Sequence, residues 1–216
     1  MDASKLVDEV LGLLRDGRGR TLLGLAGAPA AGKSTLARYL VDQVQCRLGP
    51  GTAAYVPMDG FHLSNVQLER LGLSSRKGSA PSFDVWGYVA LLERLRSPGG
   101  HPVYVPDYDR VLDEPVAARH LVAPTARLVL TEGNYLASGE PGWRRARGLL
   151  DEVWFLDAPD PLRERRLIAR QLAGGRDAAA ARAWITGNDH PNGEVVKATR
   201  GDCTRVITVE DLPPNG

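Results

Sequence analysis

Eight residues near the start of the chain, Gly27 to Ser34, constrain the fold more than any other feature of the sequence. They read Gly-Ala-Pro-Ala-Ala-Gly-Lys-Ser, which fits the pattern G-x-x-x-x-G-K-[ST] of a phosphate-binding loop. The apolar run Thr21–Ala26 before them predicts a buried strand, and the apolar spacing over Ser34–Cys46 predicts a helix. Because such a loop requires this context, the segment predicts binding of a nucleoside triphosphate. The alternative is a glycine-rich turn with a surface lysine.

The residue types of this loop suit an anion cradle. Gly27 and Gly32 allow the backbone to turn several N–H groups toward one anion, and the following helix adds its positive N-terminal end. We expect Lys33 to reach the β and γ phosphates and the Ser34 hydroxyl to ligate Mg²⁺. The expected nucleotide-binding residues are Gly27, Ala28, Pro29, Ala30, Ala31, Gly32, Lys33, Ser34 and Thr35.

The length and charge of the chain limit its possible partners. A chain of 216 residues predicts a single domain spanning 1–216. A formal net charge of +1 argues against a nucleic-acid partner, and no apolar run approaches membrane-spanning length. Cys46 and Cys203 lie too far apart to indicate a zinc site or a disulfide framework. Since Met1–Leu6 does not resemble a leader, the expected location is the cytoplasm.

Strand and helix patterns alternate along the chain. This alternation predicts an α/β fold, a P-loop NTPase with a doubly wound, mostly parallel sheet of about five strands and flanking helices. Val103–Val105 and Val116–Val122 predict a small β-hairpin insertion. The expected strands are Thr21–Ala26, Thr52–Met58, Arg127–Thr131, Val153–Leu156 and Arg205–Val209, and the expected helices are Leu6–Leu14, Ser34–Cys46, Ser64–Leu71, Asp84–Arg96, Asp160–Leu172 and Asp177–Ile185.

Three acids, Asp59, Glu132 and Asp157, come directly after predicted strands. Ligands of doubly wound sheets lie at the carboxyl ends of the strands, so we expect these acids near the loop. Glu132 is suited to support Mg²⁺, and its alternative role is a solvent-facing acid. Asp59 is suited to accept a proton from an attacking hydroxyl, but Asp59-Gly60 is equally consistent with a simple turn.

Four segments together resemble a known superfamily over nearly the whole chain, from about Leu22 to Ile207. They are Gly27–Ser34, Met58-Asp-Gly-Phe-His62, Pro106-Asp-Tyr-Asp109 and Thr131-Glu-Gly-Asn-Tyr135. Their order resembles the uridine kinase/phosphoribulokinase/pantothenate kinase superfamily, and most of all its bacterial nucleoside/nucleotide kinase-like branch, also described as fructose- or sugar-kinase-like. The resemblance implies that Asp59 is the catalytic base and that Glu132 supports the metal.

The same resemblance places the acceptor-binding insertions within 61–125. This segment mixes aromatic faces with hydrogen-bonding groups, as a pocket for a polyhydroxylated molecule requires. Tyr104 is alternatively a strand-packing residue, and His62 alternatively caps the next segment. The candidate acceptor-binding residues are His62, Arg76, Lys77, Phe83, Asp84, Tyr104, Tyr108 and Asp109, with Asn192 added from a family Asp-x-x-Asn element.

A predicted helix within 160–190 carries several arginines. Arg163, Arg166 and Arg170 share one face by their spacing, which by itself favours a solvated surface. The superfamily has lid arginines at this place, and Gly175-Arg176-Asp177 is similar to a step after the uridine kinase lid helix. The resemblance therefore implies a lid over 160–190, with Arg166 and Arg170 acting in catalysis and Arg170 and Arg176 binding the nucleotide.

The predicted function is that of an ATP- and Mg²⁺-dependent kinase whose partner is a small-molecule hydroxyl acceptor: a nucleoside, a sugar or a related polyol. Pantothenate and sugar phosphates remain alternative acceptors, because members of the superfamily use them. A regulatory ATPase or switch is a second class, and an inactive nucleotide-binding module is a third. The chain has neither the Asn-Lys-x-Asp of guanine-nucleotide switches nor the Leu-Ser-Gly-Gly-Gln of transporter ATPases. The resemblance also allows a homodimer.

Overall fold

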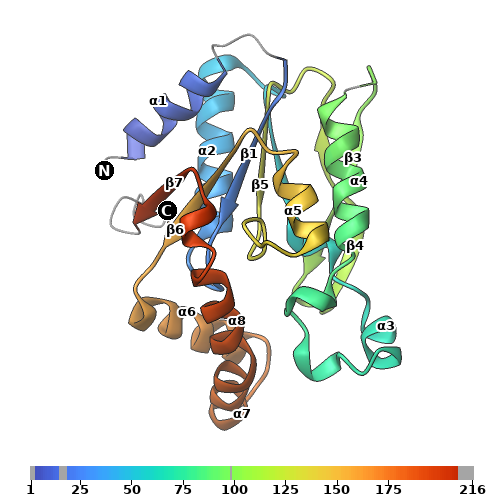
Figure 1. Cartoon of the computed structure of the whole chain (residues 1–216), viewed down its shortest axis with the longest axis vertical. Helices are drawn as coiled ribbons and strands as arrows, with labels where there is room; N and C mark the ends of the chain where they lie inside the picture. Colours follow the sequence, from blue (N-terminus) through green and yellow to red (C-terminus); the bar gives the residue numbers. More distant parts are fainter. Residues whose placement is uncertain (1–2, 15–18, 98, 209–216) are drawn as a thin grey trace.

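A five-stranded, entirely parallel sheet forms the centre of the molecule (Figure 1). The computed structural model describes residues 3–14, 19–97 and 99–208. The strand order is β2-β5-β1-β6-β7, which confirms the predicted fold class. The strands are β1 (Thr21–Ala26), β2 (Ala53–Pro57), β5 (Leu128–Glu132), β6 (Glu152–Asp157) and β7 (Arg205–Thr208).

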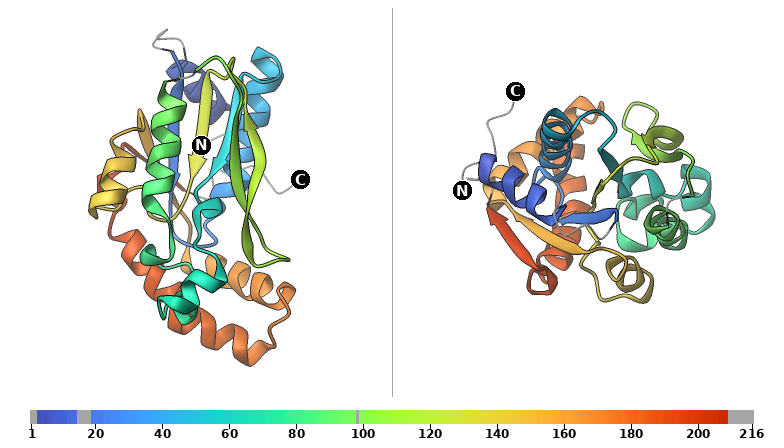
Figure 2. Two further views of the ribbon diagram at one scale, coloured as in Figure 1. Left: turned by 90° about the vertical axis from the view of Figure 1, so that its right-hand side faces the viewer. Right: turned by 90° about the horizontal axis from the view of Figure 1, so that it is seen from above.

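Helices cover both faces of this sheet (Figure 2). On one face, α1 (Ala3–Leu13) and α2 (Lys33–Leu48) pack on side chains such as Leu23 and Leu130. On the other face, α4 (Val85–Arg96) and α5 (Pro141–Arg147) pack on side chains such as Val56 and Val129. The central strands are buried on both sides, which explains their nearly continuous apolar sequences.

The strand register brings the predicted site residues to one edge of the sheet. Leu25 of β1 and Pro57 of β2 both pair with Glu132 of β5. Glu132 therefore lies between the end of β1, where the glycine-rich loop begins, and the end of β2, where Met58–Phe61 forms a 3₁₀ turn containing Asp59. Parallel pairing, rather than nearness in sequence, unites the three motifs.

A two-stranded antiparallel hairpin, β3 (Val103–Asp109) and β4 (Glu114–Val122), stands beside β2. It confirms the predicted insertion. The hairpin packs directly on the 3₁₀ turn: a Cβ atom at Gly60 would lie 2.4 Å from the carbonyl oxygen of Pro106. The glycine after Asp59 is therefore required by a close backbone approach.

Short helices gather at the carboxyl end of the sheet, at the bottom of Figure 1. They are α3 (Asn65–Arg70), α6 (Asp160–Ala173), α7 (Ala178–Trp184), a π-helical turn (Ile185–Asp189) and α8 (His190–Lys197), with 3₁₀ turns at Ser74–Arg76 and Ala80–Ser82. A further 3₁₀ turn, Arg200–Asp202, connects α8 to β7. The sequence patterns did not predict α5 or α8. No helix in the described part of the chain is long and apolar enough to span a membrane.

Candidate active site

The phosphate-binding loop joins the carboxyl end of β1 to the first turn of α2. Gly27 and Gly32 have φ angles of 151° and 106°, and Ala30 also lies in the left-handed region, with a φ of 63°. At Gly27 a Cβ atom would stand 2.6 Å from the carbonyl oxygen of Leu156, so glycine lets the loop pass close to β6. Because no side chain caps the start of α2, its first N–H groups are left for an anion.

Lys33 is almost completely buried beneath this loop. Its Nζ atom donates to the carbonyl oxygen of Ala28 at 3.1 Å and to Oδ1 of Asn134 at 2.7 Å. Burial lowers the pKa of Lys33 to about 8, while the negative charges of Glu132 and Asp59 act in the opposite direction. The protein uses two of the three ammonium donors, which leaves one for a phosphate oxygen.

Ser34 and Glu132 meet where β5 ends beside the loop. Ser34 Oγ donates to Oε1 of Glu132 at 2.9 Å, and the Tyr55 hydroxyl donates to the same oxygen at 2.8 Å. Burial raises the pKa of Glu132, and the nearby charge of Asp59 adds to this shift. Among the described residues, no hydrogen bond uses the second carboxylate oxygen of Glu132.

The Ser34–Glu132 pair has the donor chemistry that Mg²⁺ prefers, namely a hydroxyl and a carboxylate oxygen. The described part of the chain contains no cluster of three or more His, Cys, Asp or Glu side chains that would enclose a metal ion. A magnesium ion here would therefore complete its coordination with phosphate oxygens and water, which is typical of this ion in nucleotide sites. The residues fit Mg²⁺ bound together with a nucleotide.

Asp59 lines the same small cavity as Ser34 and Glu132. The cavity has a volume of ≈ 110 Å³ and is lined by Ser34, Arg38, Tyr55, Asp59, Asp107, Tyr108, Arg110 and Glu132. Asp59 Oδ2 lies 3.9 Å from a guanidinium nitrogen of Arg110, and the Asp59 side chain is 31% exposed. The structure thus brings the predicted base, the predicted metal-side acid and the loop serine together. Asp157 lies outside the cavity and pairs with Arg200 at 3.3 Å.

The ring of His62 packs between two other aromatic rings on the acceptor side. Its centroid lies 4.0 Å from that of Phe83 and 4.7 Å from that of Tyr108. Nδ1 of His62 lies 2.8 Å from the backbone oxygen of Asp59, and because a carbonyl oxygen only accepts, Nδ1 carries the proton. Burial lowers the pKa of His62, so the ring is held neutral.

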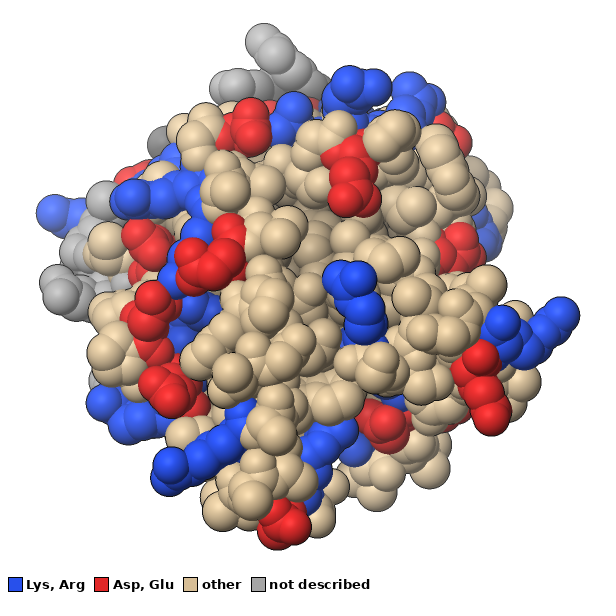
Figure 3. All heavy atoms as spheres, turned by 60° about the horizontal axis from the view of Figure 1, so that its bottom comes forward, with Lys and Arg blue, Asp and Glu red and all other residues tan. Residues whose placement is uncertain are grey.

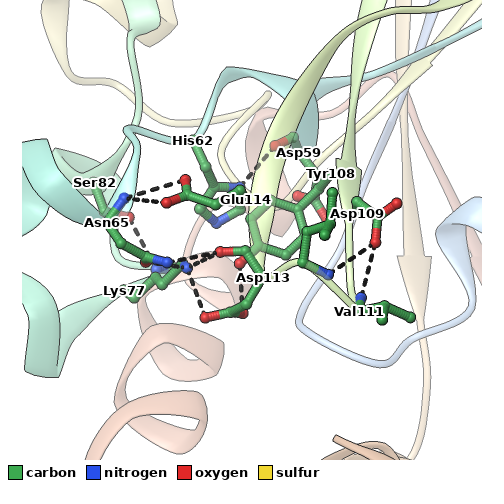
Figure 4. A network of polar contacts seen from close by, with 12 residues as sticks. Asp59, His62, Asn65, Lys77, Ser82, Tyr108, Asp109, Val111, Asp113 and Glu114 are labelled. Carbon is green, nitrogen blue, oxygen red and sulfur yellow. Dashed lines mark hydrogen bonds and ion pairs between the residues drawn. The ribbon is translucent and has the colours of Figure 1, made fainter.

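Lys77 ties the hairpin to the segment that follows the 3₁₀ turn (Figure 4). Its Nζ atom donates to Oδ1 of Asn65 at 2.6 Å, to the backbone oxygen of Asp113 at 2.6 Å and to Oδ2 of Asp113 at 2.9 Å. The hydroxyl of Tyr108 donates to Oδ1 of Asp113 at 2.6 Å. The backbone N–H of Asn65 donates to Glu114 at 3.0 Å. These bonds hold the hairpin tip against the entrance of the site.

Of the nine predicted acceptor-binding residues, only Tyr108 lines the cavity. Phe83 is buried, and Asp84 caps α4 by accepting from the N–H of Gly87 at 2.8 Å. Asp109 accepts from backbone N–H groups of the hairpin turn. Tyr104 is 61% exposed and does not face the cavity, because its position alternates with the buried Val103 and Val105. The side chain of Arg76 is exposed as well.

Asn192 is buried on α8 and does not line the cavity. Its Nδ2 atom donates to Oδ1 of Asn188 at 3.2 Å, and Asn188 in turn donates to the backbone oxygen of Lys77 at 2.7 Å. Asn192 thus supports a link between the π-helical turn and the acceptor segment. Direct contact of Asn192 with an acceptor stays a prediction.

Three arginines of α6, Arg163, Arg166 and Arg170, have different partners. Arg163 and Arg166 donate to the loop carbonyls of Pro29, Ala30 and Ala31 at 3.0–3.2 Å, and so fasten α6 to the loop. Arg170 pairs with Asp189 at 3.5 Å and lies within electrostatic reach of Lys33 and Asp59, and burial lowers its pKa. Arg176 instead stacks on Trp184 at 4.3 Å. Acidic and basic side chains are interspersed over this end of the molecule (Figure 3).

Five residues at the site did not follow from the sequence patterns: Arg38, Tyr55, Asp107, Arg110 and Asn134. Asp107 and Asn134 lie inside the segments Pro106–Asp109 and Thr131–Tyr135, so their motifs offered a signal. Asp107 accepts a hydrogen bond from Nε2 of His120 at 2.8 Å. Burial by itself raises the pKa of Asp107. The hydrogen bonds from His120 and from the Tyr108 N–H outweigh burial, so the pKa of Asp107 is lowered. No sequence signal marks Arg38 or Tyr55 as a site residue, since most arginines in helices and most tyrosines in strands serve only in packing or at the surface.

Comparisons with known proteins agree with this geometry. No family model matches the chain. It is 32% identical over 160 residues to the "Putative uridine kinase C227.14" of Schizosaccharomyces pombe, covering 72% of this chain and 68% of that protein. It is 35% identical over 178 residues to "Uncharacterized protein YggC" of Escherichia coli, covering 82% and 73%. The crystal structure of a "putative fructose transport system kinase" from Silicibacter sp. TM1040 matches with a TM-score of 0.86 and 37% identity, covering 96% of this chain and 99% of that chain.

Proposed function

Because the chain belongs to the P-loop kinases that are similar to uridine kinase and pantothenate kinase, we propose that it transfers the γ-phosphate of ATP to a hydroxyl group of a nucleoside, a sugar or a related polyol. The observation that carries this proposal is the shared cavity of Ser34, Asp59 and Glu132. A phosphate loop alone would support any nucleotide-binding protein. A carboxylate that faces the loop across a cavity supports transfer to an acceptor.

Each residue has a distinct task in this proposal. Asp59 orients the acceptor hydroxyl and takes its proton as the oxygen attacks the γ-phosphorus. Lys33 and the loop N–H groups hold the β and γ phosphates, and Arg170 stabilises the charge that develops on the transferred group. Mg²⁺ held by Ser34 and Glu132 would supply charge neutralisation between the β and γ phosphates. Positioning and electrostatics therefore provide most of the rate enhancement.

The decisive experiment measures ADP release from ATP with and without added acceptors: nucleosides, free sugars, sugar phosphates and pantothenate. A kinase consumes ATP only when its acceptor is present. A regulatory ATPase or switch hydrolyses ATP at the same slow rate whichever small molecule is added, and that outcome would refute the proposal.

Asp59→Asn tests the proton acceptor. We expect turnover to fall at least about a hundredfold, the scale of removing a positioned general base, while ATP binding persists. Asp157→Asn is a matched control, because Asp157 also lies at the carboxyl end of the parallel sheet and its side chain is 35% exposed, close to the 31% of Asp59, but it lies outside the cavity. Near-normal turnover of Asp59→Asn would remove Asp59 from the mechanism.

A further inference from the structure

Two arginines line the cavity with most of their hydrogen-bonding capacity unused. Arg38, on α2, contacts the ring of Tyr55 at 5.1 Å, and none of the hydrogen bonds or ion pairs among the described residues involves its guanidinium. Arg110, in the hairpin turn, has a single ion-pair partner in the part of the chain that the structure describes, Asp59 at 3.9 Å, and its side chain is 57% exposed. A guanidinium has five N–H donors in a fork that matches carboxylate and phosphate oxygens.

The carboxylates of the cavity do not satisfy these arginines. Glu132 accepts from Ser34 and Tyr55. Asp107 accepts from His120 and from the backbone N–H of Tyr108. Only Asp59 approaches Arg110, at a distance too long for a hydrogen bond. The two guanidinium groups therefore keep N–H donors that no described side chain uses, although three carboxylates, Asp59, Asp107 and Glu132, line the same cavity.

We infer that the acceptor carries an anionic group, a carboxylate or a phosphate, which Arg110 binds with support from Arg38. This inference rests on the proposed kinase function, and it narrows the acceptor to the anionic alternatives, a sugar phosphate or a carboxylate such as pantothenate, in place of a neutral nucleoside or sugar. Binding the anion draws Arg110 toward the acceptor and leaves Asp59 to receive the hydroxyl proton. The acceptor oxygen then forms a bond to the γ-phosphorus, the bond from that phosphorus to the β–γ bridging oxygen breaks, and ADP leaves with the bond electrons.

The other basic residues of the acceptor side are poorly suited to this role. The Lys77 ammonium has three donors, and all three are directed to Asn65 and Asp113. Arg76 does not line the cavity. Arg119 of the hairpin pairs with Asp109 at 3.1 Å. Arg110 and Arg38 are the arginines that both line the cavity and have donors to spare.

A rival role for Arg110 is contact with the γ-phosphate rather than with the acceptor. The two roles predict different kinetics. An arginine that stabilises the transferred phosphoryl group affects kcat with every acceptor, whereas one that binds an acceptor anion affects the acceptor KM and only for anionic acceptors. Measuring KM and kcat separately distinguishes them.

The test compares matched acceptors that differ in charge: fructose with fructose 6-phosphate, glycerol with glycerate, and pantothenol with pantothenate. We expect wild-type kcat/KM to be at least about tenfold higher for an anionic member than for its neutral partner. Arg110→Gln should raise the KM of that acceptor about 10- to 100-fold, the scale of a hydrogen bond to a charged group, with the KM of ATP unchanged. Arg38→Gln should raise it by less, because Arg38 only supports the contact.

Arg119→Gln is the control, since this arginine lies on the same hairpin but outside the cavity, and it should leave acceptor KM within about twofold. Preference for the neutral member, or an equal loss of kcat with both members in Arg110→Gln, would overturn the anionic acceptor and leave the kinase intact. If no acceptor of either class stimulates ADP release, the proposed function fails and this inference fails with it.

Discussion

The phosphate loop and the acceptor side of the cavity are held in place in different ways. The loop is one continuous segment between β1 and α2, and its anion-binding groups are mostly backbone N–H groups. The side that we propose for the acceptor consists of the 3₁₀ turn and the hairpin, with residues 65–82 and the π-helical turn packed beside them, and these segments lie far apart in the chain. Side-chain bonds join these parts, such as Lys77 to Asp113 and Asn188 to the backbone of Lys77.

This difference separates general from specific binding. A cradle of backbone groups recognises phosphate whatever the rest of the ligand is, because every residue supplies the same N–H group. A wall of side chains from several segments can change its acceptor by changing one residue. Substitutions in the loop should therefore impair every reaction of the protein, and substitutions on the acceptor side should act mainly on the acceptor.

Among the substitutions that test this difference between the two sides, Lys33→Met is expected to lower activity the most. It removes a charge from the phosphate side, so kcat should fall about 10²- to 10³-fold with every acceptor, the scale of losing one transition-state donor. Steady-state kinetics with two chemically different acceptors checks this. Lys197→Met serves as the control, because Lys197 lies at the end of α8, outside the cavity, and pairs with Asp160. A loss confined to one acceptor would contradict the separation of the two sides.

Gly60→Ala should act through the position of the hairpin. The new Cβ atom would stand 2.4 Å from the Pro106 carbonyl oxygen, so the hairpin must move away from Asp59. We expect the free energy of unfolding to fall by about 1–3 kcal/mol, as in overpacked sites, and the acceptor KM to rise more than the ATP KM. Chemical denaturation and kinetics measure the two quantities.

Gly139→Ala is the matched control for this substitution, because no described atom lies within 4 Å of its added Cβ. Its stability and both KM values should stay close to those of the wild type. If Gly60→Ala behaves in the same way, the hairpin does not depend on this close approach.

A smaller effect is expected from Lys77→Met, which breaks the link between the hairpin tip and the acceptor segment. The Lys77 side chain is 12% exposed and that of Asp113 is 67% exposed, so solvent weakens their ion pair. The acceptor KM should rise at most about fivefold and the ATP KM should not change. A double-mutant cycle with Asp113→Asn isolates this pair. Additive effects of the two substitutions would show that it does not hold the hairpin.

The smallest expected effect is that of His62 on how the stability of the fold depends on pH. Its pKa in the folded protein is lowered by burial, so below the unfolded-state value of about 6.5 the unfolded chain binds more protons than the folded one. The stability associated with neutral His62 is therefore present above that pH and is lost as the pH falls. Thermal unfolding at pH 7 and pH 5 should show a smaller loss for His62→Asn than for the wild type. An equal loss would mean that other groups cause it.

The sequence patterns predicted the strands of the sheet and most of the helices, but they did not predict the helices α5 and α8. Their segments contain Pro141 and Pro191 together with glycines, which read as helix breakers. In the structure Pro141 stands at the start of α5, where an N–H group has no intrahelical partner to lose, and Pro191 is the second residue of α8, which continues directly from the π-helical turn. Proline and glycine occur both where a helix is interrupted and where one begins, so only the packing of the segment shows which of the two applies.

Site residues that belong to a short sequence motif were predictable from the sequence, and those outside such motifs were not. Lys33, Ser34, Asp59 and Glu132 belong to short motifs or strand ends, and the structure brings all four together. Tyr104 and Arg176 were proposed from composition and resemblance, and they lie on an exposed strand position and against Trp184. A motif specifies backbone shape, whereas residue type alone does not specify where a side chain points.

Residue order alone was sufficient for the phosphate loop, the parallel α/β architecture and the presence of acids at strand ends. These features depend on contacts between near neighbours and on the period of the apolar residues. Only the tertiary structure places Arg38 and Arg110 in the same cavity as Asp59, and only the tertiary structure pairs the ammonium group of Lys77 with the carboxylate of Asp113. The pairs Asp59–Arg110 and Lys77–Asp113 join residues 51 and 36 positions apart in the chain, and their energies depend on distances that only the packing of the hairpin against the sheet creates.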